Sequence, residues 1–236
     1  MERWALVSGL RGDLALYEKI QRDLRRQRGV CSLFILGDLI GPHHDCNALL
    51  KRLRQPKRDD LAPDCIYGWW EEQFLAESGY RGDRRADGLR DMHGNEAVQA
   101  LLASVDVSHH RWLASLQFGF IELDCALIHG SSADVSDQLT PDTSPLVLMD
   151  RLTRLDVNRL FTARCGQQFQ FELTGGQIYS KVQDHCSENK IEQPVPKKSV
   201  IGIGCGSHYT LYDPATDRID FCSLDDKPTS HKRGFG

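Results

Sequence analysis

The sequence predicts an α/β fold in which two packed β-sheets lie between outer helices. In the first third of the chain an apolar strand followed by a helix occurs three times, which is typical of parallel strands joined by crossover helices. Two more helical segments follow, and most of the remainder has strand chemistry with turn signals between the strands. The chain of 236 residues is long enough to bury a large core.

The first half is expected to hold the three strand–helix units. The apolar run "CSLFILG" is typical of a parallel strand buried on both faces, and the helix after it is expected to stop at Pro56. The predicted elements are a strand over 4–8, a helix from 14 to about 27, a strand over 31–37, a helix over 45–56, a strand over 64–68 and a helix over 71–79.

The second half begins with a charged stretch over 80–92, which is predicted to be a solvated connection. The elements after it are helices over 95–105 and 108–116, a strand hairpin over 118–130, a helix over 144–156, strands over 159–163, 168–173 and 175–182, a loop insertion over 182–197 and closing strands within 199–224. We expect a single domain over 1–223, followed by a flexible C-terminal tail over 224–236.

Composition argues against several functional classes. The net charge of −4 gives no reason to expect nucleic acid or a membrane as a partner, and the basic run at 51–58 is balanced by nearby acids. No apolar run reaches spanning length, and the first is too short for a signal peptide, so a cytoplasmic location is expected. The eight cysteines form no C-x-x-C pair and are expected to be reduced thiols.

Five short motifs occur along the chain, and most of them contain glycine next to a charged or polar residue. In chain order they are "GLRGD", "GDLIGP", "GWWEE", "IHGS" and "ARCGQ". In their order and spacing, over residues 4–223, they resemble the motifs of the calcineurin-like metallophosphoesterases, specifically the compact bacterial branch. The resemblance implies a four-layer αββα sandwich of two mixed β-sheets. In the family, two divalent cations about 4 Å apart activate a water and clamp the phosphoryl oxygens.

The resemblance also shows which ligands have changed. In the first motif the metal-binding aspartate is Gly9 and the histidine is Arg11, while Gly12 keeps the turn and Asp13 replaces an asparagine. In the second motif the bridging carboxylate is retained as Asp38.

The remaining motifs have lost most of their ligands. In the third, Trp69 replaces the asparagine ligand and Trp70 the catalytic histidine, while Glu71 matches the final acid. The fourth keeps His129, and in the fifth Arg164 and Gly166 stand around Cys165 in place of both histidines.

The losses predict that the two-metal mechanism is absent, since one carboxylate and one imidazole do not hold two cations. We therefore expect a non-catalytic pseudoenzyme with a binding, scaffolding or regulatory role, whose partner is another protein or a small anionic ligand. The alternative is a phosphatase or phosphodiesterase with a single Mn or Zn ion on Asp38 and His129, with Asp13 as a candidate third ligand.

The two arginines allow three interpretations. Arg11 and Arg164 balance the charge of Asp38 and Glu71, or they form an anion pocket together with the Gly12 turn at a helix N-terminus, or the motif is misaligned.

The tryptophans and several other side chains leave further alternatives open. Trp69 and Trp70 fill the volume that metals and water would occupy, or they form a platform for a ring-shaped ligand or a partner side chain. Cys165 and Cys205 are ordinary thiols or a redox pair. The "HGNEAV" stretch at 93–98 is interpreted as coincidence, and His109 and His110 as part of a solvated helix face.

Overall fold

The computed structural model describes residues 2–82, 84–173 and 197–225. The strands of the first sheet are β1 (Arg3–Val7), β2 (Val30–Leu36), β3 (Pro63–Ile66), β9 (His208–Asp213) and β10 (Arg218–Ser223). Their order is β10-β9-β1-β2-β3, with β1, β2 and β3 parallel and β9 and β10 antiparallel to their neighbours. This sheet is therefore mixed.

The second sheet is also mixed. Its strands are β4 (Gly119–Glu122), β5 (Cys125–Ile128), β6 (Arg159–Thr162), β7 (Gln168–Leu173) and β8 (Lys198–Ile203). They are arranged in the order β4-β5-β6-β8-β7, in which β5, β6 and β8 are parallel and the two edge strands are antiparallel.

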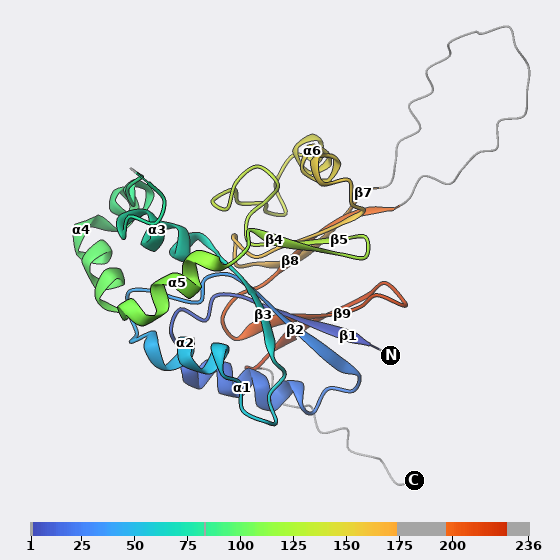
Figure 1. Cartoon of the computed structure of the whole chain (residues 1–236). Coiled ribbons are helices and arrows are strands. Elements are labelled where there is room, and N and C mark those ends of the chain that lie inside the picture. Colours follow the sequence, from blue (N-terminus) through green and yellow to red (C-terminus); the bar gives the residue numbers. More distant parts are fainter. Residues whose placement is uncertain (1, 83, 174–196, 226–236) are drawn as a thin grey trace, which may run out of the picture.

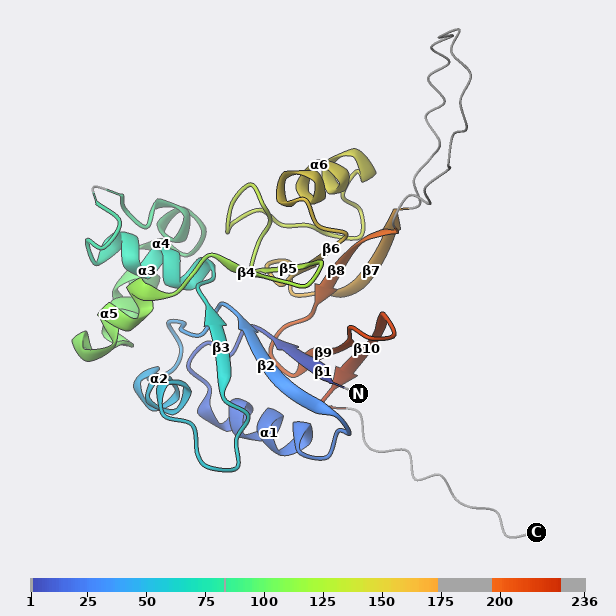
Figure 2. The same ribbon diagram turned by 45° about the vertical axis from the view of Figure 1, so that its right-hand side comes forward.

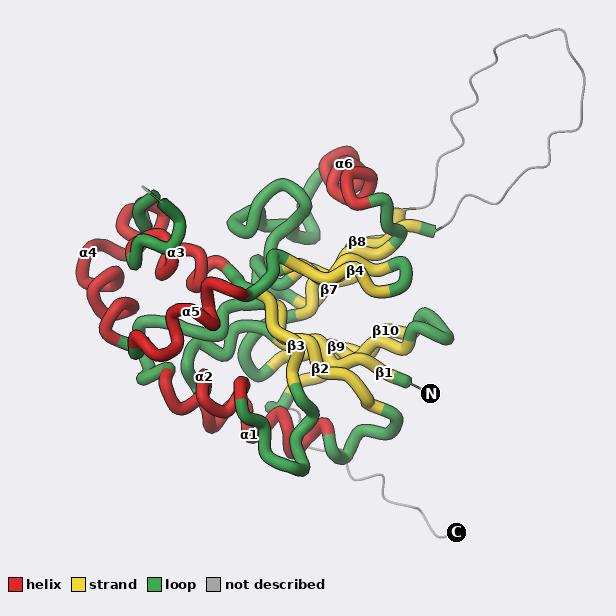
Figure 3. The backbone as a smooth tube through the Cα atoms, viewed as in Figure 1, coloured by secondary structure: helices red, strands yellow, loops and turns green. Residues whose placement is uncertain are grey.

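Helices cover both outer faces of the paired sheets. They are α1 (Leu14–Leu24), α2 (Asn47–Arg54), α3 (Trp69–Glu77), α4 (Asp87–Ala103), α5 (Val107–Ser115) and α6 (Pro145–Leu155). Figure 1 shows α1 and α2 against the first sheet and α6 against the second, while α3, α4 and α5 gather at one end. The turned view in Figure 2 and the tube in Figure 3 show the same two sheets packed face to face.

Three apolar clusters hold these layers together. The cluster between the sheets combines Leu6 and Phe34 from the first sheet with Leu127, Phe161 and Ile201 from the second. A second cluster packs α1, α2, α3 and α5 on the first sheet, and a third packs α6 on the second. The predicted four-layer αββα sandwich of two mixed sheets is confirmed.

Two predicted boundaries were wrong for identifiable reasons. Helix α3 begins at Trp69 rather than at residue 71, because Gly68 is its N-cap and Glu71 accepts a hydrogen bond from the Gly68 backbone N–H. Residues 87–92, expected in a solvated connection, are the first turns of α4, which is kinked where Gly94 has a φ of +79°.

Several expectations fall wholly or partly outside the described residues. These are the strand over 175–182, the loop insertion up to 196 and the tail from 226 onward. Of the expected tail, Leu224 is still bound to the domain, because its N–H donates to the carbonyl oxygen of Ser207 at 2.9 Å. Within the described residues, every helix is too short or too polar to cross a lipid bilayer.

Candidate functional site

Two interlocked turns position the candidate site at the carboxyl ends of β1 and β2. The backbone N–H groups of Gly9, Arg11 and Gly12 donate to the carbonyl oxygens of residues 37, 38 and 39, at 3.4, 2.9 and 2.7 Å. These bonds bring the side chain of Arg11, from the first turn, next to the second turn. They also occupy N–H groups that an anion would otherwise use.

Gly12 and Asp13 have structural roles in the first turn. Gly12 has a φ of +87°, and a Cβ there would lie 2.8 Å from Cys46 Sγ, so a side chain would be both strained and crowded. Asp13 is the N-cap of α1, where its Oδ1 accepts a hydrogen bond from the Leu16 N–H at 2.8 Å. The helix N-terminus is thus capped by a carboxylate. This corrects the expectation that the Gly12 turn offers its N–H groups to an anion.

Asp38 is at the centre of the site, with its side chain only 6% exposed. Its Oδ2 lies 3.7 Å from Arg11 Nη2. Its Oδ1 accepts a hydrogen bond from the Trp70 N–H at 3.3 Å and lies 3.3 Å from His129 Nε2. The carboxylate is therefore contacted by one guanidinium, one backbone donor and one imidazole.

Glu71 is fully buried behind Asp38, and backbone groups satisfy it. It accepts hydrogen bonds from the N–H groups of Asp38, Ile40 and Gly68, at 2.9, 2.9 and 2.6 Å. Burial and the negative charge of Asp38 raise the pKa of Glu71 above its ordinary value. The expected pairing of an arginine with Glu71 was wrong, since the described residues place no basic side chain in an ion pair with this carboxylate.

His129 follows β5 and is 1% exposed. Its Nδ1 lies 2.7 Å from the carbonyl oxygen of Leu36, and because a carbonyl only accepts, Nδ1 carries the proton. Burial lowers the pKa of His129, although the charge of Asp38 opposes this shift. Nε2 is buried, lies 3.3 Å from Asp38 Oδ1 and has no hydrogen-bond partner among the described residues.

The tryptophans and arginines of the site pack on one another. Arg164 lies over the ring of Trp69, with Cζ 4.6 Å from the ring centroid, and Arg11 lies 5.9 Å from that of Trp70. Both indoles are buried, at 3% and 7% exposure. Burial lowers the pKa of Arg164, whose Nε has no hydrogen-bond partner in the described part of the chain.

Helix α4 contributes a side chain that the sequence interpretation missed. The imidazole of His93 is stacked on Trp70, with 5.8 Å between ring centroids and an interplanar angle of 27°. The "HGNEAV" stretch, set aside as coincidence, thus begins at a residue of the site. The only signal in the sequence was Gly94, whose positive φ kinks the helix directly after His93.

These side chains surround a pocket of about 450 Å³. Six of the ten residues that line it carry aromatic or basic groups: Arg11, His43, Trp69, Trp70, His93 and Arg164.

The other four lining residues are Pro42, Met92, Ala97 and Gln138, so the lining holds no carboxylate. Asp38 lies behind Arg11 and is not part of the lining. Trp69 and Trp70 border this pocket, although both indoles are largely buried.

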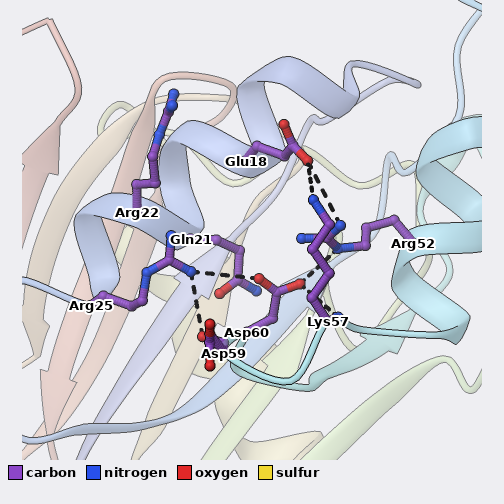
Figure 4. Close-up of a pocket in the computed structure, with 8 residues that line it drawn as sticks. All are labelled: Glu18, Gln21, Arg22, Arg25, Arg52, Lys57, Asp59 and Asp60. Carbon is purple, nitrogen blue, oxygen red and sulfur yellow. Dashed lines mark hydrogen bonds and ion pairs between the residues drawn. The ribbon is translucent and has the colours of Figure 1, made fainter.

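A second pocket, of about 370 Å³, lies between α1 and α2 (Figure 4). It differs from the first pocket because acidic side chains also line it. Three of its four basic side chains, those of Arg25, Arg52 and Lys57, are paired with acids. Arg52 Nε lies 2.7 Å from Asp60 Oδ2, and Lys57 Nζ lies 3.1 Å from Glu18 Oε1. Figure 4 shows Arg22 pointing away from these pairs.

The donor set does not fit a two-metal centre. The part of the chain that the structure describes contains no group of three or more His, Cys, Asp or Glu side chains that could hold a metal ion. Asp38 and His129 contact each other directly, Asp13 is used as a helix cap, and Arg11 lies on the remaining side of Asp38. A cation would have to displace these contacts.

Two other expectations concern cysteine and histidine residues. Cys165 and Cys205 are both free thiols in partly buried positions. Their loops lie side by side, since a Cβ on Gly166 would lie 3.1 Å from Cys205 Sγ. The solvated face expected at His109 was wrong, because this residue is 7% exposed and its Nδ1 lies 3.3 Å from Arg54 Nη1.

No family model matches the sequence, and no curated protein matches it. Among solved structures, a metallophosphoesterase from Sphaerobacter thermophilus is 15% identical with a TM-score of 0.64, covering 96% of this chain and 89% of its own. A hypothetical protein from Pyrococcus horikoshii OT3 is 13% identical with a TM-score of 0.67, covering 97% and 90%. A cold-active protein-tyrosine phosphatase from a Shewanella species is 13% identical with a TM-score of 0.54, covering 94% and 78%. The chain has the fold of these proteins.

Proposed function

We propose that this protein is a non-catalytic relative of the metallophosphoesterases, in which a binding role replaces two-metal hydrolysis. One observation carries the proposal. Arg11 contacts Asp38 and lies over Trp70, while Arg164 lies over Trp69. These four residues stand at the positions where the resemblance places metal ligands and the catalytic histidine.

The charges around Asp38 support this proposal. Two like unit charges about 4 Å apart repel by about 4 kcal/mol at the effective dielectric constant of a protein surface, and a divalent ion doubles that term. A cation bound to Asp38 would be close to Arg11, whose guanidinium already supplies positive charge there. Arg11 thus neutralises the carboxylate and opposes metal binding.

The loss of proton-transfer groups points in the same direction. An indole donates a hydrogen bond but does not exchange a proton near neutral pH, so Trp70 cannot protonate a leaving group. The imidazole of His93 packs on Trp70, but it comes from α4 and stacks on the ring rather than replacing it.

One observation favours the alternative of a single-metal phosphoesterase. The Nε2 atom of His129 is buried, has no hydrogen-bond partner in the described part of the chain and lies beside the Asp38 carboxylate. These two groups would supply about half of the ligands that one metal ion needs. Zinc sites normally use at least three protein ligands. The two donors therefore lack a third, because Asp13 caps α1.

Hydrolysis assays separate the two proposals. We expect the purified chain to release no 4-nitrophenol from 4-nitrophenyl phosphate or bis(4-nitrophenyl) phosphate in excess Mn²⁺ or Zn²⁺, beyond the rate of an Asp38→Asn variant measured in parallel. Turnover that is removed both by a chelator and by Asp38→Asn would instead establish the single-metal enzyme.

A further inference from the structure

We propose that the pocket between Arg11, Arg164 and the two tryptophans binds a small phosphomonoester or phosphonate that carries a planar ring. This inference rests on the proposed function, because it gives the site a ligand in place of metals. The ligand is held by guanidinium groups and aromatic walls, with no metal ion between the protein and the phosphoryl oxygens.

The charge of the lining is the first reason. The pocket is lined by two arginines and two histidines, and by no aspartate or glutamate. Four other pockets among the described residues, including the one between α1 and α2, each contain at least one acidic side chain. An anion entering this pocket therefore meets donors and positive charge, with no carboxylate in the lining to repel it.

Unused hydrogen-bond capacity is the second reason. Arg11 reaches Asp38 only at 3.7 Å, which is beyond hydrogen-bond distance, and its side chain is 48% exposed. Arg164 has a buried Nε with no partner among the described residues. Each guanidinium has five N–H donors in a planar fork that matches the oxygens of a phosphoryl group. Two such forks on one pocket can share a dianionic phosphoryl group.

The aromatic side chains that border the pocket are the third reason. Trp69 and Trp70 are held in place by their own packing and by the cations above them. His93 stacks on Trp70 and is itself exposed, and the adjacent Met92 is 56% exposed. His93 and Met92 both line the pocket, and an imidazole and a thioether are polarisable groups that make favourable contacts with an aromatic ring.

The size and shape of the pocket favour a small molecule over a polymer. Its volume of about 450 Å³ lies in the usual range for small-molecule sites. Its basic groups converge on one cavity instead of forming a stripe along the surface, which a nucleic-acid backbone would require. The ligand class is therefore a single phosphoryl group attached to one ring.

Calorimetric titration of the full chain with three probes tests the proposal. We expect phenylphosphonate to bind saturably, methylphosphonate to bind about tenfold more weakly, and benzyl alcohol not to bind, since only the first combines dianion and ring. Phenylphosphonate should also change tryptophan fluorescence, because Trp69 and Trp70 border the cavity.

Charge-removing variants locate the binding. Arg11→Gln and Arg164→Gln should each weaken phenylphosphonate binding by about tenfold or more, the effect of losing one charge-assisted bond. Arg22→Gln removes the same charge from the other pocket and should leave the affinity unchanged. Arg164→Lys keeps the positive charge and serves if Arg164→Gln unfolds; it should still bind more weakly than the original chain, because the planar fork is lost.

Three results would overturn the proposal. They are an absence of saturation at about 10 mM phenylphosphonate, an affinity for methylphosphonate equal to that for phenylphosphonate, and an effect of Arg22→Gln as large as that of Arg11→Gln. A phosphonate has no phosphoester bond, so binding is measured independently of hydrolysis. Turnover of an aryl phosphate would refute the proposed function alone, whereas absent phosphonate binding would refute this inference alone.

Discussion

The guanidinium of Arg11 lies 3.7 Å from the carboxylate of Asp38, and both residues adopt left-handed backbone conformations, with φ of +46° and +55°. Such conformations cost about 1–3 kcal/mol in residues other than glycine and persist only where surrounding contacts enforce them. Here the enforcing contacts are the bond from the Arg11 N–H to the Asp38 carbonyl and the bond from the Asp38 N–H to Glu71. The fold thus holds the cation and the anion next to each other on strained turns.

Glu71→Gln is expected to destabilise the domain by about 2–4 kcal/mol. The three N–H groups bound by Glu71 need two acceptor oxygens, and an amide replaces one oxygen with an NH₂ group that faces a donor. Urea unfolding, followed by circular dichroism, measures the change in the free energy of unfolding.

The matched control for that change is Glu72→Gln on the same helix. Glu72 is only half-buried and makes no side-chain hydrogen bond within the described residues, so its replacement should alter stability by less than about 0.5 kcal/mol. Equal losses in the two variants would show that the backbone bonds of Glu71 are not what stabilises this region.

Gly68→Ala is expected to cost about 2–3 kcal/mol of unfolding free energy. A Cβ at this position would overlap the backbone nitrogen of Asp38 and lie 2.9 Å from His129 Nδ1, so β2, β3 and β5 would have to separate. Gly88→Ala is the control, because a Cβ in α4 would meet Gln73 Oε1 at an ordinary 3.4 Å. Thermal unfolding should show Gly88→Ala unchanged or up to about 1 kcal/mol more stable. A Gly68→Ala variant as stable as the original would contradict the close approach.

Stability is expected to fall as the pH is lowered through the ordinary titration range of histidine near 6.5. Burial, and then the charge of Arg54, lower the pKa of His109 in the folded state, while Asp106 and Asp45 oppose the shift. Between the folded and unfolded pKa values the unfolded chain binds more protons, so stability rises with pH and is lost on acidification. His129, whose pKa is also lowered, adds to the same trend.

The contribution of His109 is measured by the difference in unfolding free energy between pH 7.5 and pH 5.5. His109→Gln should make this difference smaller, because the lowered pKa of His109 no longer contributes. A pH dependence in His109→Gln as large as in the original chain would refute the assignment.

Most of the fold could be predicted, because it follows from the periodicity of apolar residues and from the order of strand and helix segments along the chain. The apolar run of β2 and the glycine turns after β1 and β2 are local patterns, and their order indicated the two sheets. The N-terminal cap of α3 could also be predicted, since Gly68 and Glu71 have the spacing of a capping box. Asp13 is likewise a typical N-cap residue at the start of α1. Both caps are local signals in the sequence, although the resemblance placed Asp13 and Glu71 in the metal-site motifs.

The remainder of the site depends on tertiary contacts. His93 reaches Trp70 only because α4 bends at Gly94 and packs against α3, two elements whose separation in sequence does not fix their contact. The burial of His109 likewise depends on Arg54 from a distant helix. The preference of Glu71 for backbone donors over arginine follows from its position behind Asp38, which no local pattern specifies.

The metal content of the purified chain is the sharpest test of whether the site around Asp38 holds two metal ions. The protein would be produced in medium supplemented with Mn²⁺ and Zn²⁺, purified without chelators and analysed by plasma mass spectrometry beside an Asp38→Asn variant. We expect far less than one equivalent of either metal, with no difference between the two proteins. Two equivalents per chain in the original protein, lost in the Asp38→Asn variant, would contradict this expectation.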